Sequence, residues 1–280
     1  MARVIAIANQ KGGVGKTTTA VNLAASLAVA ERRTLLIDGD PQGNATSGVG
    51  IERSAFERTT YDILIGEAGI AETRLRHVQF QHLDVVPATP DLAGAEVELV
   101  DASDREQRMR RSIRAVQDEY DFILIDCPPS LGLITLNMLA AADALLIPLQ
   151  CEYYALEGLS QLLNTVHLIQ HSVNPELAIA GVLLTMYDAR LNLSRQVAAD
   201  AREYFGAQVF DTIVPRNVRL AEAPSFGKPI ALYDVQSIGA QAYIAVAHEL
   251  IRREAATAAE ARSHVAHTST PALGSRGASA

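Results

Sequence analysis

The sequence has few cysteines, few lysines and no long apolar run, and each shortage excludes a class of protein. Its two cysteines, Cys127 and Cys151, belong to no CxxC pair, so neither a disulfide framework nor a zinc site is expected. No stretch approaches the roughly 20 apolar residues of a membrane span. The N-terminus lacks the longer apolar run and cleavage site of a signal peptide, which favours a cytoplasmic protein without a membrane segment.

Lysine is the second shortage. Only three of the 24 basic residues are lysine, namely Lys11, Lys16 and Lys228. The first two lie close together, which indicates that the chemistry of lysine is required there. The net charge of −8 excludes a globally basic nucleic-acid binder, but it is compatible with a local basic patch.

Apolar runs alternate with helix-like stretches along most of the chain, and continuous apolar runs are typical of parallel strands covered on both faces. The predicted strands are 4–8, 34–38, 83–86, 122–126, 144–148, 179–184 and a short 209–214. The predicted helices are 17–30, 104–119, 135–141, 156–171, 194–205 and 237–253. This alternation predicts a single α/β domain with a doubly wound, mostly parallel sheet and helices on both faces.

A glycine-rich loop lies between the first predicted strand and the first predicted helix. Its glycines allow the backbone to wrap around phosphates, and the helix N-terminus adds a positive dipole end. Lys16 is placed to reach the β- and γ-phosphates, and the Thr17 hydroxyl to hold Mg²⁺. Capping of the helix explains the threonines but not the lysines. The predicted nucleotide-binding residues are Lys11, Gly12, Gly13, Val14, Gly15, Lys16, Thr17 and Thr18.

The loop departs from the general GxxxxGK[ST] pattern, because Gln10 occupies the first glycine position. It reads KGGxGKTT instead, which resembles the deviant Walker A signature of the ParA/MinD superfamily of P-loop NTPases. The resemblance implies that ATP and Mg²⁺ are bound, and that Lys11 reaches across an ATP-dependent homodimer to the partner's phosphates. Two lysines would neutralise the charge that develops in phosphoryl transfer, so Lys11 and Lys16 are both predicted to act in catalysis.

Carboxylates follow two of the predicted strands. Asp38 and Asp40 lie at the carboxyl end of the strand 34–38, and Asp126 ends the strand 122–126 in the Walker B form. The resemblance implies that Asp40 orients the attacking water and that Asp38 supports the metal shell. Asp126 would hold Mg²⁺, usually through water. A mere turn after the strand 34–38 is the structural alternative.

A dinucleotide-binding unit is another alternative, since it too carries an acidic residue about 20 positions after its glycines. Thr18 stands where that fingerprint needs Gly or Ala, and a lysine suits a triphosphate better. An iron–sulfur reductase is a further alternative function. It needs two cysteines that converge at a dimer axis, whereas Cys127 directly follows Asp126 and is expected to be a packing residue.

Three longer blocks, 38–50, 150–159 and 214–229, resemble the chromosomal ParA or Soj subgroup. The resemblance covers about residues 2–254 and implies a deviant Walker A ATPase domain over 1–254. It also makes Pro215 and Asn217 candidates for contacting adenine. Residues 255–280 are predicted to form a tail that is disordered from about 263, because they lack a bulky apolar period.

The same subgroup implies a chromosome or plasmid partition ATPase. Its ATP-bound dimer would bind double-stranded DNA nonspecifically through Arg190 and Arg219 and would be released when a ParB-type partner stimulates hydrolysis. Such a protein would be cytoplasmic and nucleoid-associated. An ordinary solvated face is the alternative for these arginines.

A MinD-like membrane-associated ATPase is the alternative function, and it needs a C-terminal amphipathic helix. Residues 255–280 hold only one leucine, Leu273, and no lysine. A related ATPase that positions another cargo would carry nearly the same residues, so the sequence distinguishes it poorly from a partition ATPase.

Overall fold

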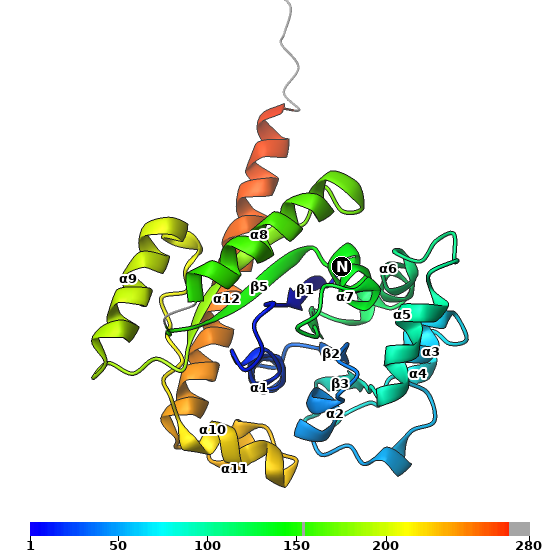
Figure 1. Ribbon diagram of the computed structural model, residues 1–280, viewed down its shortest axis with the longest axis horizontal. Coiled ribbons are helices and arrows are strands. Elements are labelled where there is room, and N and C mark those ends of the chain that lie inside the picture. Colours follow the sequence, from blue (N-terminus) through cyan, green and yellow to red (C-terminus); the bar gives the residue numbers. More distant parts are fainter. Residues whose placement is uncertain (153–154, 269–280) are drawn as a thin grey trace, which may run out of the picture.

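The computed structural model describes residues 1–152 and 155–268. The protein contains a six-stranded sheet in which every strand pair is parallel (Figure 1). The spatial order is β3-β2-β4-β1-β5-β6. The strands are β1 (Arg3–Ile7), β2 (Thr34–Asp38), β3 (Leu83–Val86), β4 (Phe122–Asp126), β5 (Ala144–Gln150) and β6 (Ala178–Thr185). The predicted doubly wound α/β fold is therefore confirmed.

The predicted strand 209–214 is wrong. The structure has isolated bridges here, between Val182 and Val209 and, one residue past the segment, between Tyr187 and Pro215, but no continuous strand. The amides of Phe210 and Val214 donate to carbonyls of β6 at 2.9 Å. The amides of Asp211 and Thr212 donate to the carboxylate of Glu249 at 2.8 and 2.9 Å. Because these amides are paired with a side chain, they are not available for a strand ladder.

Helices cover both faces of the sheet, and β1 shows why. Its side chains alternate, so that Ile5 and Ile7 face one core and Val4 and Ala6 face the other. The first core is closed by α1 (Lys16–Val29) and α12 (Ile238–Thr268). The second is closed by α3 (Thr60–Ile65), α6 (Arg108–Arg114), α7 (Leu133–Ala141), α8 (Ala155–Ser172) and α9 (Asn192–Phe205). Shorter helices are α2 (Asn44–Gly48), α4 (Ile70–Thr73), α5 (Ala95–Glu98), α10 (Val218–Glu222) and α11 (Ile230–Tyr233).

The last helix is longer than the sequence pattern predicts. It continues past residue 253 to Thr268, and its C-terminal part projects from the body of the molecule (Figure 1). Alanine, glutamate and arginine, which are strong helix formers, dominate residues 254–262. Disorder was predicted from about residue 263, whereas the structure continues the helix over 263–268, and the rest of that prediction lies outside the described residues. No helix in the described part is long and apolar enough to cross a membrane.

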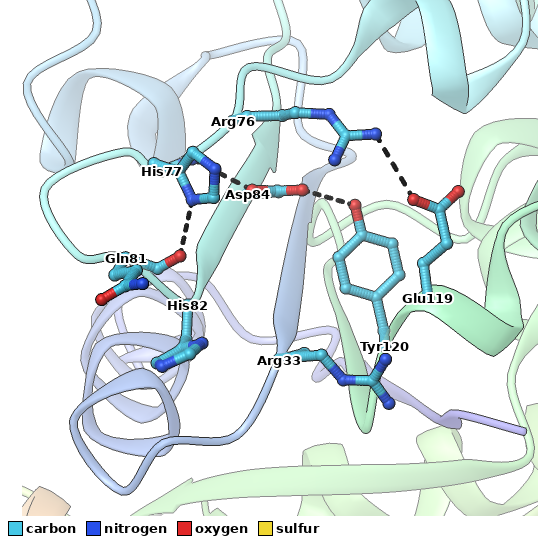
Figure 2. A pocket seen from close by; sticks show the side chains of 8 residues that line it. All are labelled: Arg33, Arg76, His77, Gln81, His82, Asp84, Glu119 and Tyr120. Carbon is cyan, nitrogen blue, oxygen red and sulfur yellow. Dashed lines mark hydrogen bonds and ion pairs between the residues drawn. The ribbon is translucent and has the colours of Figure 1, made fainter.

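A polar network fastens the edge strand β3 at its amino end. The buried carboxylate of Asp84 accepts hydrogen bonds from the Tyr120 hydroxyl at 2.7 Å and from the backbone amide of His77 at 3.0 Å. Arg74 donates to the same hydroxyl at 2.6 Å and pairs with Glu119 at 2.7 Å. Figure 2 shows the small cavity beside this network, about 210 Å³ in volume. Among the charged groups that line it, Arg76 pairs with Glu119 at 3.4 Å, and Arg33 pairs with Asp121 just outside the cavity, which indicates a structural role.

Candidate functional site

The glycine-rich loop connects the carboxyl end of β1 to the first turn of α1. Gly13 and Gly15 have φ angles of +74° and +89°, the left-handed region that glycine adopts without strain. The Gly15 carbonyl accepts a hydrogen bond from the Thr19 amide at 2.8 Å, which starts the helix. The free amides of the loop and of this first turn form an anion-binding site at the sheet edge where open α/β folds bind ligands.

Two residues that the sequence reasoning missed anchor this loop. The Asn9 amide nitrogen donates to the Pro148 carbonyl at 2.8 Å, and its oxygen accepts from the Lys11 amide at 3.0 Å. The Thr185 hydroxyl donates to the Val14 carbonyl at 2.8 Å. Asn9 and Thr185 are both polar and lie at the carboxyl ends of apolar strands, which is the signal that would have found them.

The two lysines of the loop contact each other through the backbone. The Lys16 ammonium donates to the Lys11 carbonyl at 3.1 Å, and the Lys16 side chain is buried. Burial lowers the pKa of Lys16, while the negative charges of Asp126 and Asp40 act in the opposite direction. The fold thus brings together the predicted Lys16, Asp40 and Asp126, which come from three separate segments.

Asp38 and Asp126 are neighbours on adjacent strands, and both are fully buried. Neither carboxylate oxygen of Asp126 has a hydrogen-bond partner among the described residues. Burial raises the pKa of Asp126 well above its usual range, and the charge of Asp38 adds to the rise, whereas Thr17 and Lys16 oppose it. A buried carboxylate without donors fits a ligand of a hard cation such as Mg²⁺, with the Thr17 hydroxyl beside it.

The Asp38 carboxylate is surrounded by donors of the protein itself. One oxygen accepts from the Asp40 amide at 3.2 Å, and the other accepts from the amide and the hydroxyl of Thr46 at 2.8 and 2.6 Å. Burial raises the pKa of Asp38 to about 6, although these hydrogen bonds oppose the shift. Asp38 supports the loop that carries Asp40, and its role in the metal shell stays a prediction.

A cavity of about 310 Å³ opens beside the loop, lined by Gly15 and Thr18 as well as by the predicted Pro215 and Asn217. The Asn217 oxygen accepts from the Leu220 amide at 3.3 Å and so caps α10. Apolar side chains form most of the remaining lining, among them Met186, Val214, Val218 and Leu220. The cavity suits a flat heterocycle attached to phosphates in the loop.

The two predicted DNA-binding arginines lie on connected surface segments. The Arg216 amide donates to the Tyr187 carbonyl at 2.9 Å, which ties the segment before Arg190 to the segment before Arg219. Both arginine side chains are exposed and each is paired with acidic neighbours. Arg190 pairs with Asp188 at 2.7 Å, and this hydrogen bond lowers the pKa of Asp188 to about 2. Arg219 pairs with Glu222 at 2.9 Å and with Asp234 at 3.5 Å.

The cysteines do not form a metal site. Cys127 and Cys151 are both buried, at 1% and 2% exposure. Burial raises the pKa of the Cys127 thiol, which leaves it protonated and unreactive. The iron–sulfur alternative needs cysteines at a surface between subunits, and this geometry argues against it.

Comparison with known proteins identifies the family of this chain. Residues 2–179 match the family model AAA_31, described as an AAA domain. The chromosome partitioning protein ParA of Myxococcus xanthus is 60% identical over 252 residues, which cover 90% of this chain and 89% of that protein. The sporulation initiation inhibitor protein Soj of Bacillus subtilis is 58% identical over 250 residues, which cover 89% and 98%.

A solved structure is also similar over most of the chain. It is that of cobyrinic acid a,c-diamide synthase from Mycobacterium smegmatis with a bound ATP analog and magnesium. It is 36% identical, has a TM-score of 0.79, and the match covers 90% of this chain and 95% of that one. The chain belongs to the ParA/Soj family of chromosome partitioning proteins, within the ParA/MinD superfamily of P-loop NTPases.

Proposed function

We propose that this protein is an ATPase that partitions a chromosome or plasmid, with ATP and Mg²⁺ bound at the glycine-rich loop. The observation that carries the proposal is the convergence of Lys16, Asp40 and Asp126 beside a loop with the additional lysine Lys11. Asp126 and Thr17 are the residues that would hold Mg²⁺, and the ion would neutralise the phosphate charge. The cavity next to Pro215 and Asn217 would take the adenine.

The protein residues have separate tasks in hydrolysis. Lys16 binds the terminal phosphates and stabilises the charge that develops on them. Asp40 orients the attacking water, and its position beside Lys16 fits that task. Lys11 is partly exposed on the loop, where it is accessible to the nucleotide of a second subunit. Two subunits would thus close face to face over ATP, and hydrolysis would be slow without a ParB-type partner.

DNA binding is proposed for the dimer rather than for the monomer. Arg190 and Arg219 are exposed but are paired with carboxylates, and such exposed pairs are weak. The arginines can therefore exchange these partners for DNA phosphates, without reading bases. Dimerisation would place two such surfaces on one duplex, so that two weak contacts act together. Release of the dimer from the nucleoid would follow ATP hydrolysis.

A cargo-positioning or MinD-like membrane-associated ATPase is the second candidate. The relatives at 58% and 60% identity carry names that refer to chromosome partitioning or to sporulation, and they cover nearly the whole chain. The structure named as a synthase is less similar, at 36% identity. These identities favour the partition function.

The test is binding to a random-sequence DNA duplex at fixed salt, since phosphate contacts depend strongly on salt. Three states are compared: Asp40→Ala with ATP, the wild type with ADP, and the wild type without nucleotide. Asp40→Ala should retain ATP, stay dimeric and bind DNA tightly, whereas the other two states should bind weakly. No binding in any state would contradict the DNA-linked function and leave the second candidate. Normal hydrolysis by Asp40→Ala would refute the role of Asp40.

A further inference from the structure

We propose that Thr46 is a positioning residue for ATP hydrolysis, which bridges the carboxylate of Asp38 to the amide of Ala88 and thereby holds Asp40 in place. This inference rests on the hydrolysis proposed above. Thr46 lies on α2, six residues beyond Asp40, and it is buried. It belongs to none of the motifs that bind phosphate or metal.

The Thr46 hydroxyl makes hydrogen bonds on both sides. It donates to an oxygen of Asp38 at 2.6 Å and accepts from the Ala88 amide at 3.0 Å. Ala88 lies just beyond the end of β3, so a single hydroxyl connects the ends of β2 and β3. No other residue type of similar size offers a donor, an acceptor and a branched carbon that fills the same space.

The Asp38 carboxylate connects Thr46 to the loop that carries Asp40. Its second oxygen accepts from the Asp40 amide at 3.2 Å, so that Asp40 and Thr46 are held by one carboxylate. The Asp40 side chain in turn accepts from the Gln42 amide at 2.9 Å, and the Asp40 carbonyl from the Gly43 amide at 2.9 Å. The result is a closed turn whose orientation depends on Asp38.

The same loop rests against the Ala88 carbonyl. Gly43 has a φ of +62°, and a Cβ atom on it would lie 3.0 Å from the Ala88 oxygen. The loop thus has two fixed points on Ala88, namely the packing of Gly43 and the hydrogen bond of Thr46. Without the hydroxyl, Asp38 loses one of its donors, the Ala88 amide loses its acceptor, and only the packing contact still fixes the loop to Ala88, while the Thr46 amide keeps its bond to Asp38. A carboxylate that orients water tolerates little displacement, so the hydrolytic step should be the one affected.

The test uses Thr46→Ala and Thr46→Val, which lack the hydroxyl, and Thr46→Ser, which keeps it. The variants without the hydroxyl should hydrolyse ATP at least about tenfold more slowly, a typical loss for a misplaced catalytic group, and should bind ATP within about threefold of the wild type. Thr46→Ser should stay within about threefold of the wild type in both measurements. Thr46→Ala suits a helix better than Thr46→Val, and it serves if the valine variant does not fold.

A double-mutant cycle separates positioning from a general structural effect. In an Asp40→Ala background, Thr46→Ala should change the residual hydrolysis less than about twofold, because the group that it positions is already absent. Equal losses in both backgrounds would overturn the proposal. Wild-type hydrolysis by Thr46→Ala would overturn it as well.

A readout without hydrolysis keeps this proposal distinct from the proposed function. Hydrogen exchange of the Gln42 and Gly43 amides should be faster in Thr46→Ala than in the wild type and unchanged in Thr46→Ser. Unchanged exchange in Thr46→Ala would contradict the positioning role even in a protein that hydrolyses ATP. A wild-type protein without ATPase activity would contradict the proposed function, whatever the exchange shows.

Discussion

The ammonium group of Lys16 donates a hydrogen bond to the carbonyl oxygen of Lys11, 3.1 Å away. One lysine of the loop thus orders the backbone that carries the other. Because Lys16 is buried beside Asp40 and Asp126, its charge is held close to where phosphates would bind. This arrangement explains the lysine at position 16, whereas only the backbone of Lys11 takes part in it.

Lys16→Ala should weaken ATP binding by about 10- to 100-fold, the equivalent of about 1.5–3 kcal/mol for a hydrogen bond to a charged group. The substitution removes both the contact with the phosphates and the bond that orders the loop. Titration with a fluorescent ATP analogue measures the loss. Lys228→Ala is the matched control, because Lys228 is exposed and outside the loop, and it should bind as the wild type does.

Asp126→Asn should stabilise the protein in the absence of nucleotide and metal. The raised pKa of Asp126 shows that its charged form is disfavoured in the folded state, which therefore loses stability as the pH rises above the pKa of an unfolded aspartate. The free energy of unfolding should increase by about 1–3 kcal/mol at pH 8, and the gain should shrink toward pH 4. Urea unfolding measures it.

The exposed aspartate Asp118 supplies the control, since Asp118→Asn should leave the free energy of unfolding unchanged. A loss of stability in Asp126→Asn at pH 8 would contradict the account of an unsatisfied carboxylate. With ATP and Mg²⁺ added, the wild type should be more stable than Asp126→Asn, because only the wild type has the carboxylate that is proposed to hold the ion.

Arg219→Ala should bind nonspecific DNA more weakly and still hydrolyse ATP at its basal rate. Each phosphate contact contributes about 0.9 to the steepness of the plot of log affinity against log salt concentration. A dimer has two copies of Arg219, so the steepness of this plot should fall by about 2. Affinities measured at several salt concentrations give this slope. Arg33→Ala is the control, because Arg33 is also exposed and paired with a carboxylate but lies just before β2, outside the proposed DNA surface. An unchanged slope would place the DNA surface elsewhere.

Glu249→Gln should lower the free energy of unfolding by about 1–3 kcal/mol at pH 7. Glu249 is buried, accepts the amides of Asp211 and Thr212, and pairs with Arg253 at 2.7 Å. Burial raises the pKa of Glu249, but these hydrogen bonds and the charge of Arg253 outweigh it, so that the pKa lies below its usual value. The stabilisation is therefore present above the pKa of an unfolded glutamate.

This contribution should disappear as the pH falls through the lowered pKa of Glu249, so the wild type and Glu249→Gln should converge in acid. Urea unfolding at pH 7 and in acid measures both differences. A constant difference between the two proteins across this range would show that lost packing, rather than the carboxylate, causes the effect.

The sequence alone determined the strands of the sheet and the glycine-rich loop. These features are local: a continuous apolar run predicts a buried parallel strand, and β2, β3 and β4 begin and end where the pattern predicts. The lysines and glycines of the loop are likewise read within a few positions. The short helices α2, α3, α4, α5, α10 and α11 were missed, because helices of one or two turns carry too little periodicity to be recognised.

Only the tertiary structure decided how the site residues are held. Thr185 supports the loop at Val14 from 171 residues away along the chain, and Ala88 supports Thr46 from 42 residues away. The tertiary structure also decided that the Glu249 carboxylate accepts the hydrogen bond of the Asp211 amide, which is then not available to the strand predicted there. Such contacts depend on which chain segments the sheet order brings together. A pattern within one segment contains no information about the partner that its polar groups will find.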